Sequence, residues 1–153
     1  LRAQLHLRQG RLAEATQGLE SAFALLHQSP WGAEQPFQHT QSMGEFIARK
    51  DKVLGERLWS MLAKPFNSLR GEANRLQMRL VLADLLDFKQ HCAEAYASFE
   101  PHVPWSRNFL EPRARCYVQT QQPLEDQALE DLARFLSEEP TPLRPTGPSL
   151  TAP

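Results

Sequence analysis

Residues 79–100, RLVLADLLDFKQHCAEAYASFE, predict a single helical hairpin, and the rest of the chain repeats its pattern. One helix is expected to end near Phe88, and a second to begin near Gln90 after a short polar turn. Ala83 and Ala95 lie twelve residues apart, one in each helix, and Phe99 follows four residues later. Two small residues let helix backbones approach closely, and the aromatic ring one turn later fills the groove beside that contact.

The same small–small–large spacing recurs in three other segments. They contain Ala3, Ala15 and Leu19; Met43, Gly55 and Trp59, with methionine at the first small position; and Cys116, Ala128 and Leu132. Gly10 is expected to take a left-handed conformation between the first two helices. Residues 50–52 and 120–123 are expected to form the later turns, with Pro123 opening the last helix. Trp59 occupies a large position, which predicts that it lies in the core.

The repeat length is consistent with two classes of helical repeat. The second small residues follow one another at intervals of 40, 40 and 33 residues. Tetratricopeptide repeats have a length of about 34 residues and HEAT repeats one of about 40. Gly10, Leu12, Ala15 and Leu19 are spaced so that the first repeat resembles a tetratricopeptide unit. We therefore expect an all-α fold over residues 1–140: four antiparallel helix pairs stacked in a right-handed, tetratricopeptide-like solenoid. HEAT-type repeats remain the alternative.

Composition sets limits on the class and location of the protein. The net charge of −1 in 153 residues gives no general attraction for nucleic acid or for an anionic membrane. No apolar run is long enough for a membrane span. The two cysteines, Cys92 and Cys116, form no CxxC pair, and Cys116 falls on a packing position where cysteine acts as a small hydrophobe. These features predict a reducing compartment, the cytoplasm.

The two ends of the chain differ in character. Leu1 falls inside a helical pattern, so we expect the chain to be the C-terminal piece of a longer protein. Residues 141–153, TPLRPTGPSLTAP, hold four prolines in thirteen positions and no aromatic residue, which predicts a disordered tail.

Patterns typical of catalysis are missing from the sequence. It contains no phosphate-binding glycine loop, nucleophile elbow or HExxH motif. His91 and Cys92 are adjacent, which is not the spacing of metal ligands. We predict no catalytic, cofactor-binding or metal-binding residue. Trp31 and Trp105 lie between repeats and are expected to cap the ends of helix pairs, with a partner-binding anchor as the alternative.

Several short strings suggest a parent protein. They are SPW at 29–31, KPF at 64–66, EPHVPW at 100–105, RARCY at 113–117, QPL at 122–124 and DLARFLSEEP at 131–140. Together they resemble the C-terminal repeat tail of bacterial fused proteins in which a multi-pass membrane region precedes a spermidine-synthase-like aminopropyltransferase domain. The resemblance implies that this chain is a non-catalytic appendage of an enzyme whose parent is membrane-anchored. No synthase catalytic residue can be carried over.

The sequence therefore predicts a protein-interaction or scaffold domain. Its partner would be a protein, a peptide or the remainder of its own polypeptide. A regulatory domain that contributes to an enzyme active site or an oligomer interface is the rival interpretation. In tetratricopeptide arrays the first helix of each pair lines a concave groove, and the candidate binding residues on these helices are His6, Gln38, Ser42, Arg75, Arg79, Arg113 and Gln119.

Arg75 and Arg79 lie four apart on one helix and could grip a carboxylate together. The remaining cations of interest are Arg49, Lys50 and Lys52 around one turn, and Arg107 and Arg115 near the start of another helix. For all of these cations, plain solvation is the alternative.

Overall fold

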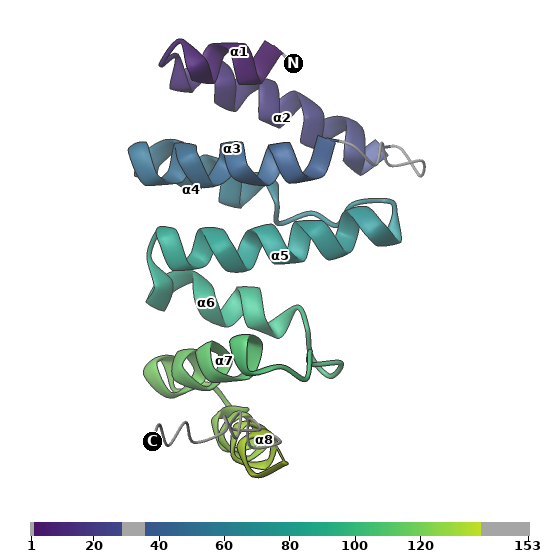
Figure 1. The fold of residues 1–153 in the computed structure, drawn as a ribbon, viewed down its shortest axis with the longest axis vertical. Helices are drawn as coiled ribbons and strands as arrows, with labels where there is room; N and C mark the ends of the chain where they lie inside the picture. Colours follow the sequence, from purple (N-terminus) through teal and green to yellow (C-terminus); the bar gives the residue numbers. More distant parts are fainter. Residues whose placement is uncertain (1, 29–35, 139–153) are drawn as a thin grey trace, which may run out of the picture.

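The computed structural model describes residues 2–28 and 36–138, which form eight α-helices and no strand. The helices are α1 Arg2–Arg8, α2 Leu12–Gln28, α3 Pro36–Lys50, α4 Lys52–Met61, α5 Leu69–Leu85, α6 Phe88–Ala97, α7 Arg107–Thr120 and α8 Glu125–Glu138. They follow one another along the long axis of the molecule, from α1 at one end to α8 at the other (Figure 1). The expected all-α class is confirmed.

Short polar side chains define where several helices begin. Asp51 accepts a hydrogen bond from the Leu54 N–H at the start of α4, and Ser68 accepts one from the Gly71 N–H at the start of α5. Asp87 caps α6 in the same way through the Gln90 N–H. Each cap satisfies a backbone donor that the first turn of a helix leaves unpaired.

The turns lie close to their expected positions, with two corrections. Gly10 has a φ of 72°, the left-handed conformation predicted for it. The hairpin in residues 79–100 turns two residues earlier than expected, because Asp87 is the cap and Phe88 already belongs to α6. Pro123 precedes the last helix and does not open it, since α8 begins at Glu125 and the left-handed residue of that turn is Gln121.

The core consists of two clusters of buried side chains. The first lies mainly among α2–α5 and contains Leu19, Phe23, Ile47, Leu58, Trp59, Leu62, Met78 and Leu82. The second lies among α6–α8 and contains Cys92, Tyr96, Phe109, Leu110, Cys116, Tyr117 and Ala128. Leu80 of α5 packs against both. The prediction that Trp59 belongs to the core is confirmed.

Small residues mark close contacts between helices. A Cβ atom added at Gly55 would lie 2.7 Å from Leu86 and 3.0 Å from Ala48, so the contact of α4 with its neighbours requires glycine there. One added at Gly18 of α2 would lie 2.8 Å from the Cβ of Ala3 in α1. Ala15 and Ala95 are almost completely buried. Small side chains therefore occupy interior contacts, as the repeat spacing indicated.

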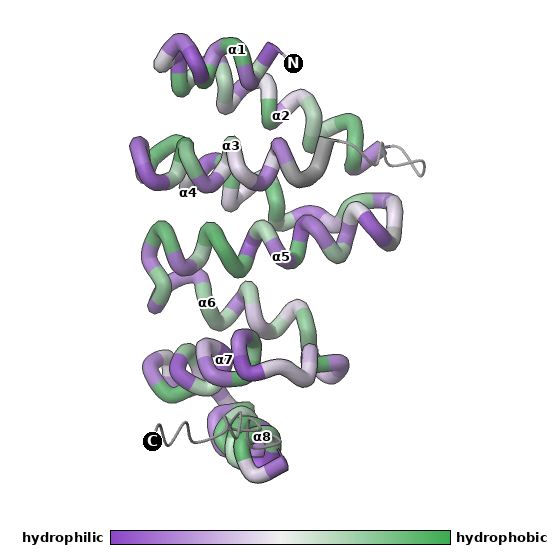
Figure 2. Tube along the Cα trace, in the orientation of Figure 1, coloured by the Kyte–Doolittle hydropathy of each residue, from purple (hydrophilic) through white to green (hydrophobic). Residues whose placement is uncertain are grey.

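Hydrophilic and hydrophobic residues both occur along the helices drawn in Figure 2. In the part of the chain that the structure describes, no helix combines the length and apolarity needed to cross a bilayer. Trp31 and the tail at 141–153 lie outside the described residues.

Candidate functional site

The arginines predicted to line a groove are buried against carboxylates of this same chain. Arg75 and Arg79 are 4% and 3% exposed. Arg75 donates to both carboxylate oxygens of Glu72, at 2.6 and 2.7 Å, and to the Leu62 carbonyl. Arg79 donates to Glu94 of α6, and its guanidinium lies 4.4 Å from the centre of the Trp59 ring. The two arginines share one face of α5, as expected, but the carboxylates that they hold belong to the chain itself.

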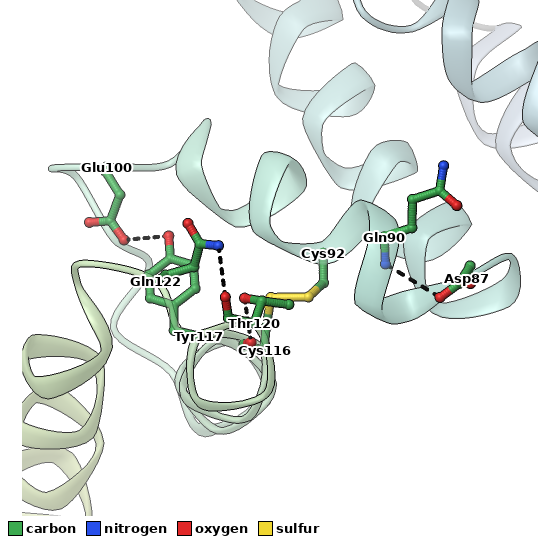
Figure 3. The surroundings of a disulfide bond; sticks show 8 residues. All are labelled: Asp87, Gln90, Cys92, Glu100, Cys116, Tyr117, Thr120 and Gln122. Carbon is green, nitrogen blue, oxygen red and sulfur yellow. Dashed lines mark hydrogen bonds between the residues drawn. A yellow bond between two sulfur atoms is a disulfide. The ribbon is translucent and has the colours of Figure 1, made fainter.

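Arg113 forms the centre of a second buried ionic group. Its side chain is fully buried and donates to Glu100 at 2.7 Å and to Asp131 at 2.8 Å. The Tyr117 hydroxyl donates to the same Glu100 oxygen at 3.1 Å (Figure 3). Burial opposes the charge on Arg113, but the two carboxylates outweigh it and raise the pKa of the guanidinium. Arg113 thereby ties α7 to α8 and to the segment that follows α6.

The ion pair at Glu72 depends on pH in a defined direction. Burial favours the neutral acid, but hydrogen bonds from Arg75 and the Phe66 N–H, together with the charges of Arg75 and Arg79, lower the pKa of Glu72 below its usual value. A carboxylate with a lowered pKa stabilises the fold above its ordinary pKa and loses that contribution as the pH falls through the lowered value. These contacts serve a structural role in the chain.

The remaining candidate residues belong to α1, α3 and α7. His6 is half-buried in α1, and Ser42 and Gln119 are exposed on α3 and α7. Gln38 belongs to α3, but its side chain lies outside the described residues. A role of any candidate in binding a partner stays a prediction.

The two cysteines form a disulfide, which corrects the expectation that they are unpaired. Cys92 of α6 and Cys116 of α7 are both fully buried, with Cα atoms 6.0 Å apart, and the bond joins the two helices (Figure 3). Cys116 does occupy a buried packing position, but as half of a cross-link. The prediction of a reducing compartment was based on unpaired cysteines and loses that basis, since disulfides are typical of oxidising compartments.

His91, next to Cys92, contacts an aromatic ring and a carboxylate. Its Nε2 atom lies 2.9 Å from the Glu56 carboxylate, and its ring centre lies 4.5 Å from that of Trp59. In residues 2–28 and 36–138 there is no group of three or more histidine, cysteine or carboxylate side chains placed to hold a metal ion.

A cleft of about 460 Å³ lies among α5, α6 and α7. In Figure 1, α6 lies between α5 and α7. The apolar part of the lining comes from Leu80 and Val81 of α5, Phe88 and Tyr96 of α6, Phe99, and Phe109 of α7. Tyr96 and Phe99 both meet Phe109 edge-on, with ring centres 5.2 and 4.9 Å apart. We call these three rings, Tyr96, Phe99 and Phe109, the aromatic floor of the cleft.

Polar side chains also line the cleft. The side chains of Arg49, Asp84, Asn108 and Arg115 all line the cleft and are exposed. Pro112 also lines it, and because proline has no N–H, the Asn108 carbonyl cannot receive its usual helical hydrogen bond from residue 112. The cleft therefore combines apolar surface with charged and hydrogen-bonding groups, which is the make-up of ligand sites in general.

Tyr96 on the cleft floor is held in its neutral form. Burial is the main cause and raises the pKa of Tyr96 to about 12, with smaller contributions from Asp84 and Tyr117. The positive charge of Arg115 lowers this pKa, but its effect is outweighed. The phenol gives the cleft no negative charge at neutral pH, and the raised pKa extends this neutrality into the alkaline range.

Among the predicted cations, the structure places Arg49 and Arg115 at the cleft, and not Arg75, Arg79 or Arg113. The sequence singled out both as members of basic groups without distinguishing them from their neighbours. Arg115 lies two residues beyond Arg113, which points it to the other side of α7.

Comparisons with protein-family models, curated proteins and solved structures found no match.

Proposed function

We propose that this chain is a non-catalytic protein-interaction domain built from antiparallel helix pairs in a tetratricopeptide-like solenoid. Contacts between consecutive helices support this architecture: α1 packs against α2, α3 against α4, α5 against α6, and α7 against α8. Contacts between α2 and α4 and between α3 and α5 link successive pairs. In a solenoid of this kind, each pair buries its apolar face against the next.

The cleft among α5, α6 and α7 is the observation that carries the proposal. Its aromatic floor can receive an apolar side chain, and its exposed polar groups can bond to the backbone or to polar side chains of an extended segment. A protein segment can offer an apolar side chain together with polar backbone and side-chain groups. The partner is therefore a peptide segment of another protein or of a longer polypeptide that contains this chain.

The perturbed ionisable groups support a binding role over catalysis. Strongly shifted pKa values can mark catalytic sites. Here burial and fixed structural partners account for each shift: Glu72 beside Arg75, Arg113 between two carboxylates, and Tyr96 and Tyr117 in the second core cluster.

A pair of matched variants tests the binding site. Val81 lines the cleft and is half-buried, whereas Val53 of α4 is 78% exposed outside it. A library of random peptides displayed on phage would be selected on the disulfide-bonded chain. We expect the selected peptides to lose binding to Val81→Arg, because the long cationic side chain fills the cleft, and to keep binding to Val53→Arg.

Thermal melting of both variants verifies that they remain folded. If the peptides bind folded Val81→Arg and the unchanged chain equally well, the cleft is not the site. If no peptide is selected in a cleft-dependent way, the proposed function is wrong.

A further inference from the structure

The cations at the cleft differ from the other arginines in their partners. Arg75, Arg79 and Arg113 each hold a carboxylate of this chain. Within the described ranges, neither Arg49 nor Arg115 has a carboxylate within ion-pair distance. The Arg115 guanidinium lies 5.0 Å from the centre of the Phe88 ring, so an aromatic contact orients it at the cleft.

Positive charge continues from the cleft onto α3. Phe46 is 42% exposed, and the Lys50 ammonium lies 5.9 Å from the centre of its ring. Phe46, Arg49 and Lys50 are three and four residues apart, so they share one face of the helix. Arg49 belongs to both surfaces, which makes the cleft and this face of α3 neighbours.

Among the residues that line the cleft, one carboxylate opposes these charges. Asp84 of α5 lines the cleft with Arg49 and Arg115, and Tyr96 stays neutral. The lining thus carries two cations and one anion, and Lys50 adds a third cation beside it. An acidic ligand would complement this distribution of charge. Asp84 would repel ligand carboxylates that come near it, and so favour one orientation of the ligand in the cleft.

We propose that the cleft recognises an acidic protein segment that carries one large apolar side chain between aspartate or glutamate residues. The apolar side chain lies on the floor formed by Tyr96, Phe99 and Phe109. The flanking carboxylates pair with Arg115 on one side and with Arg49 on the other. This inference rests on the proposed function and adds the chemistry of the partner.

Three pools of synthetic peptides test the charge preference. Each pool has one central leucine or phenylalanine and an amidated C-terminus, which excludes recognition of a terminal carboxylate. The flanking residues are Asp and Glu in the first pool, Asn and Gln in the second, and Lys in the third. We expect the unchanged chain to bind the acidic pool about tenfold more tightly than the amide pool, equivalent to ~1.4 kcal/mol. Added salt should reduce this difference, because it screens exposed charges.

Charge reversal provides the sharper measurement. The double variant Arg49→Glu/Arg115→Glu should lose the preference for the acidic pool and bind the lysine pool more tightly than the unchanged chain does. Arg134→Glu, on the exposed surface of α8, is the control for a charge reversal away from the cleft and should keep the original preference. Asp84→Asn removes the opposing carboxylate and should strengthen binding of the acidic pool several-fold.

The outcomes separate the two proposals. Equal binding of the acidic and amide pools, with binding still lost in Val81→Arg, would overturn the charge inference and leave the interaction site in place. Unchanged preference in a folded double variant would also overturn it. Absence of cleft-dependent binding by every pool would remove both proposals.

Discussion

Arg113 and Arg115 lie two residues apart in α7 and have different surroundings. Arg113 is enclosed by Glu100, Asp131 and Tyr117, and it stabilises the contact of α7 with its neighbours. Arg115 is exposed at the cleft, its guanidinium lies over the Phe88 ring, and it forms no ion pair with a carboxylate of the described residues. A buried arginine requires paired carboxylates, because an unpaired charge in the interior destabilises the fold. The first residue therefore serves stability, and the second remains available to a ligand.

The two tyrosines provide a test of this interior. Tyr96 and Tyr117 are the only tyrosines of the chain, so the absorbance of tyrosinate reports them alone. Burial is the main cause that raises the pKa of each to about 12, and Glu100 adds to it at Tyr117. We expect an ultraviolet titration of the folded chain to show no substantial ionisation at the ordinary tyrosine pKa of about 10.

The sign of the effect on stability follows from these shifts. A raised pKa stabilises the folded state fully below the ordinary value of about 10, and this contribution is lost as the pH rises through about 12. The free energy of unfolding should therefore decline across this alkaline range. In denaturant both tyrosines should titrate near 10, and the same midpoint in the folded chain would contradict the described packing.

At the scale of the helices, the sequence predicted the elements better than their ends. Gly10 and the turn around Asp51 were identified correctly, because left-handed glycine and N-caps are local features. The turn at Asp87 was displaced by two residues, since the apolar periodicity continues through Leu86 to Phe88. Asp87, a residue type that favours N-caps, marks the start of α6 instead.

The candidate site was harder to predict for a physical reason. Whether an arginine is solvated or buried depends on carboxylates from other elements, such as Glu94 for Arg79 and Asp131 for Arg113. The sequence of one helix reveals which cations share a face, but it does not reveal which carboxylates of other elements pair with them. The disulfide was missed in the same way, because a separation of 24 residues carries no signal without the packing of α6 on α7.

The cross-link between α6 and α7 makes a measurable contribution to stability. A disulfide that closes a loop of this length restricts the unfolded chain and typically contributes about 2–4 kcal/mol. We expect the double variant Cys92→Ala/Cys116→Ala to lose roughly that much free energy of unfolding, measured by denaturant titration.

Reduction supplies the control for this prediction. A thiol reductant added to the unfolded protein should lower the refolded stability of the unchanged chain and have no effect on the double variant. If the reductant leaves the denaturation midpoint of the unchanged chain where it was, the two cysteines are not joined.

For the molecule as a whole, the arrangement of the helices along one axis determines where the proposed binding cleft lies. The contacts between α2 and α4 and between α3 and α5 join the successive pairs, whereas α7 packs on α6 and α8. The cleft opens between α5 and α7, with residues of α6 contributing to its lining. Leu80 packs against both core clusters and also lines the cleft, so the site lies where the two clusters meet.

Amide chemical-shift mapping of the isotope-labelled chain with a peptide from the acidic pool tests whether the cleft among α5, α6 and α7 binds a peptide. We expect shifts concentrated at Val81, Asp84, Phe99, Asn108 and Arg115, with little change in α1 and α2. Shifts concentrated in α1 and α2, or on the outer surface of α8, would contradict the assignment of the cleft as the binding site.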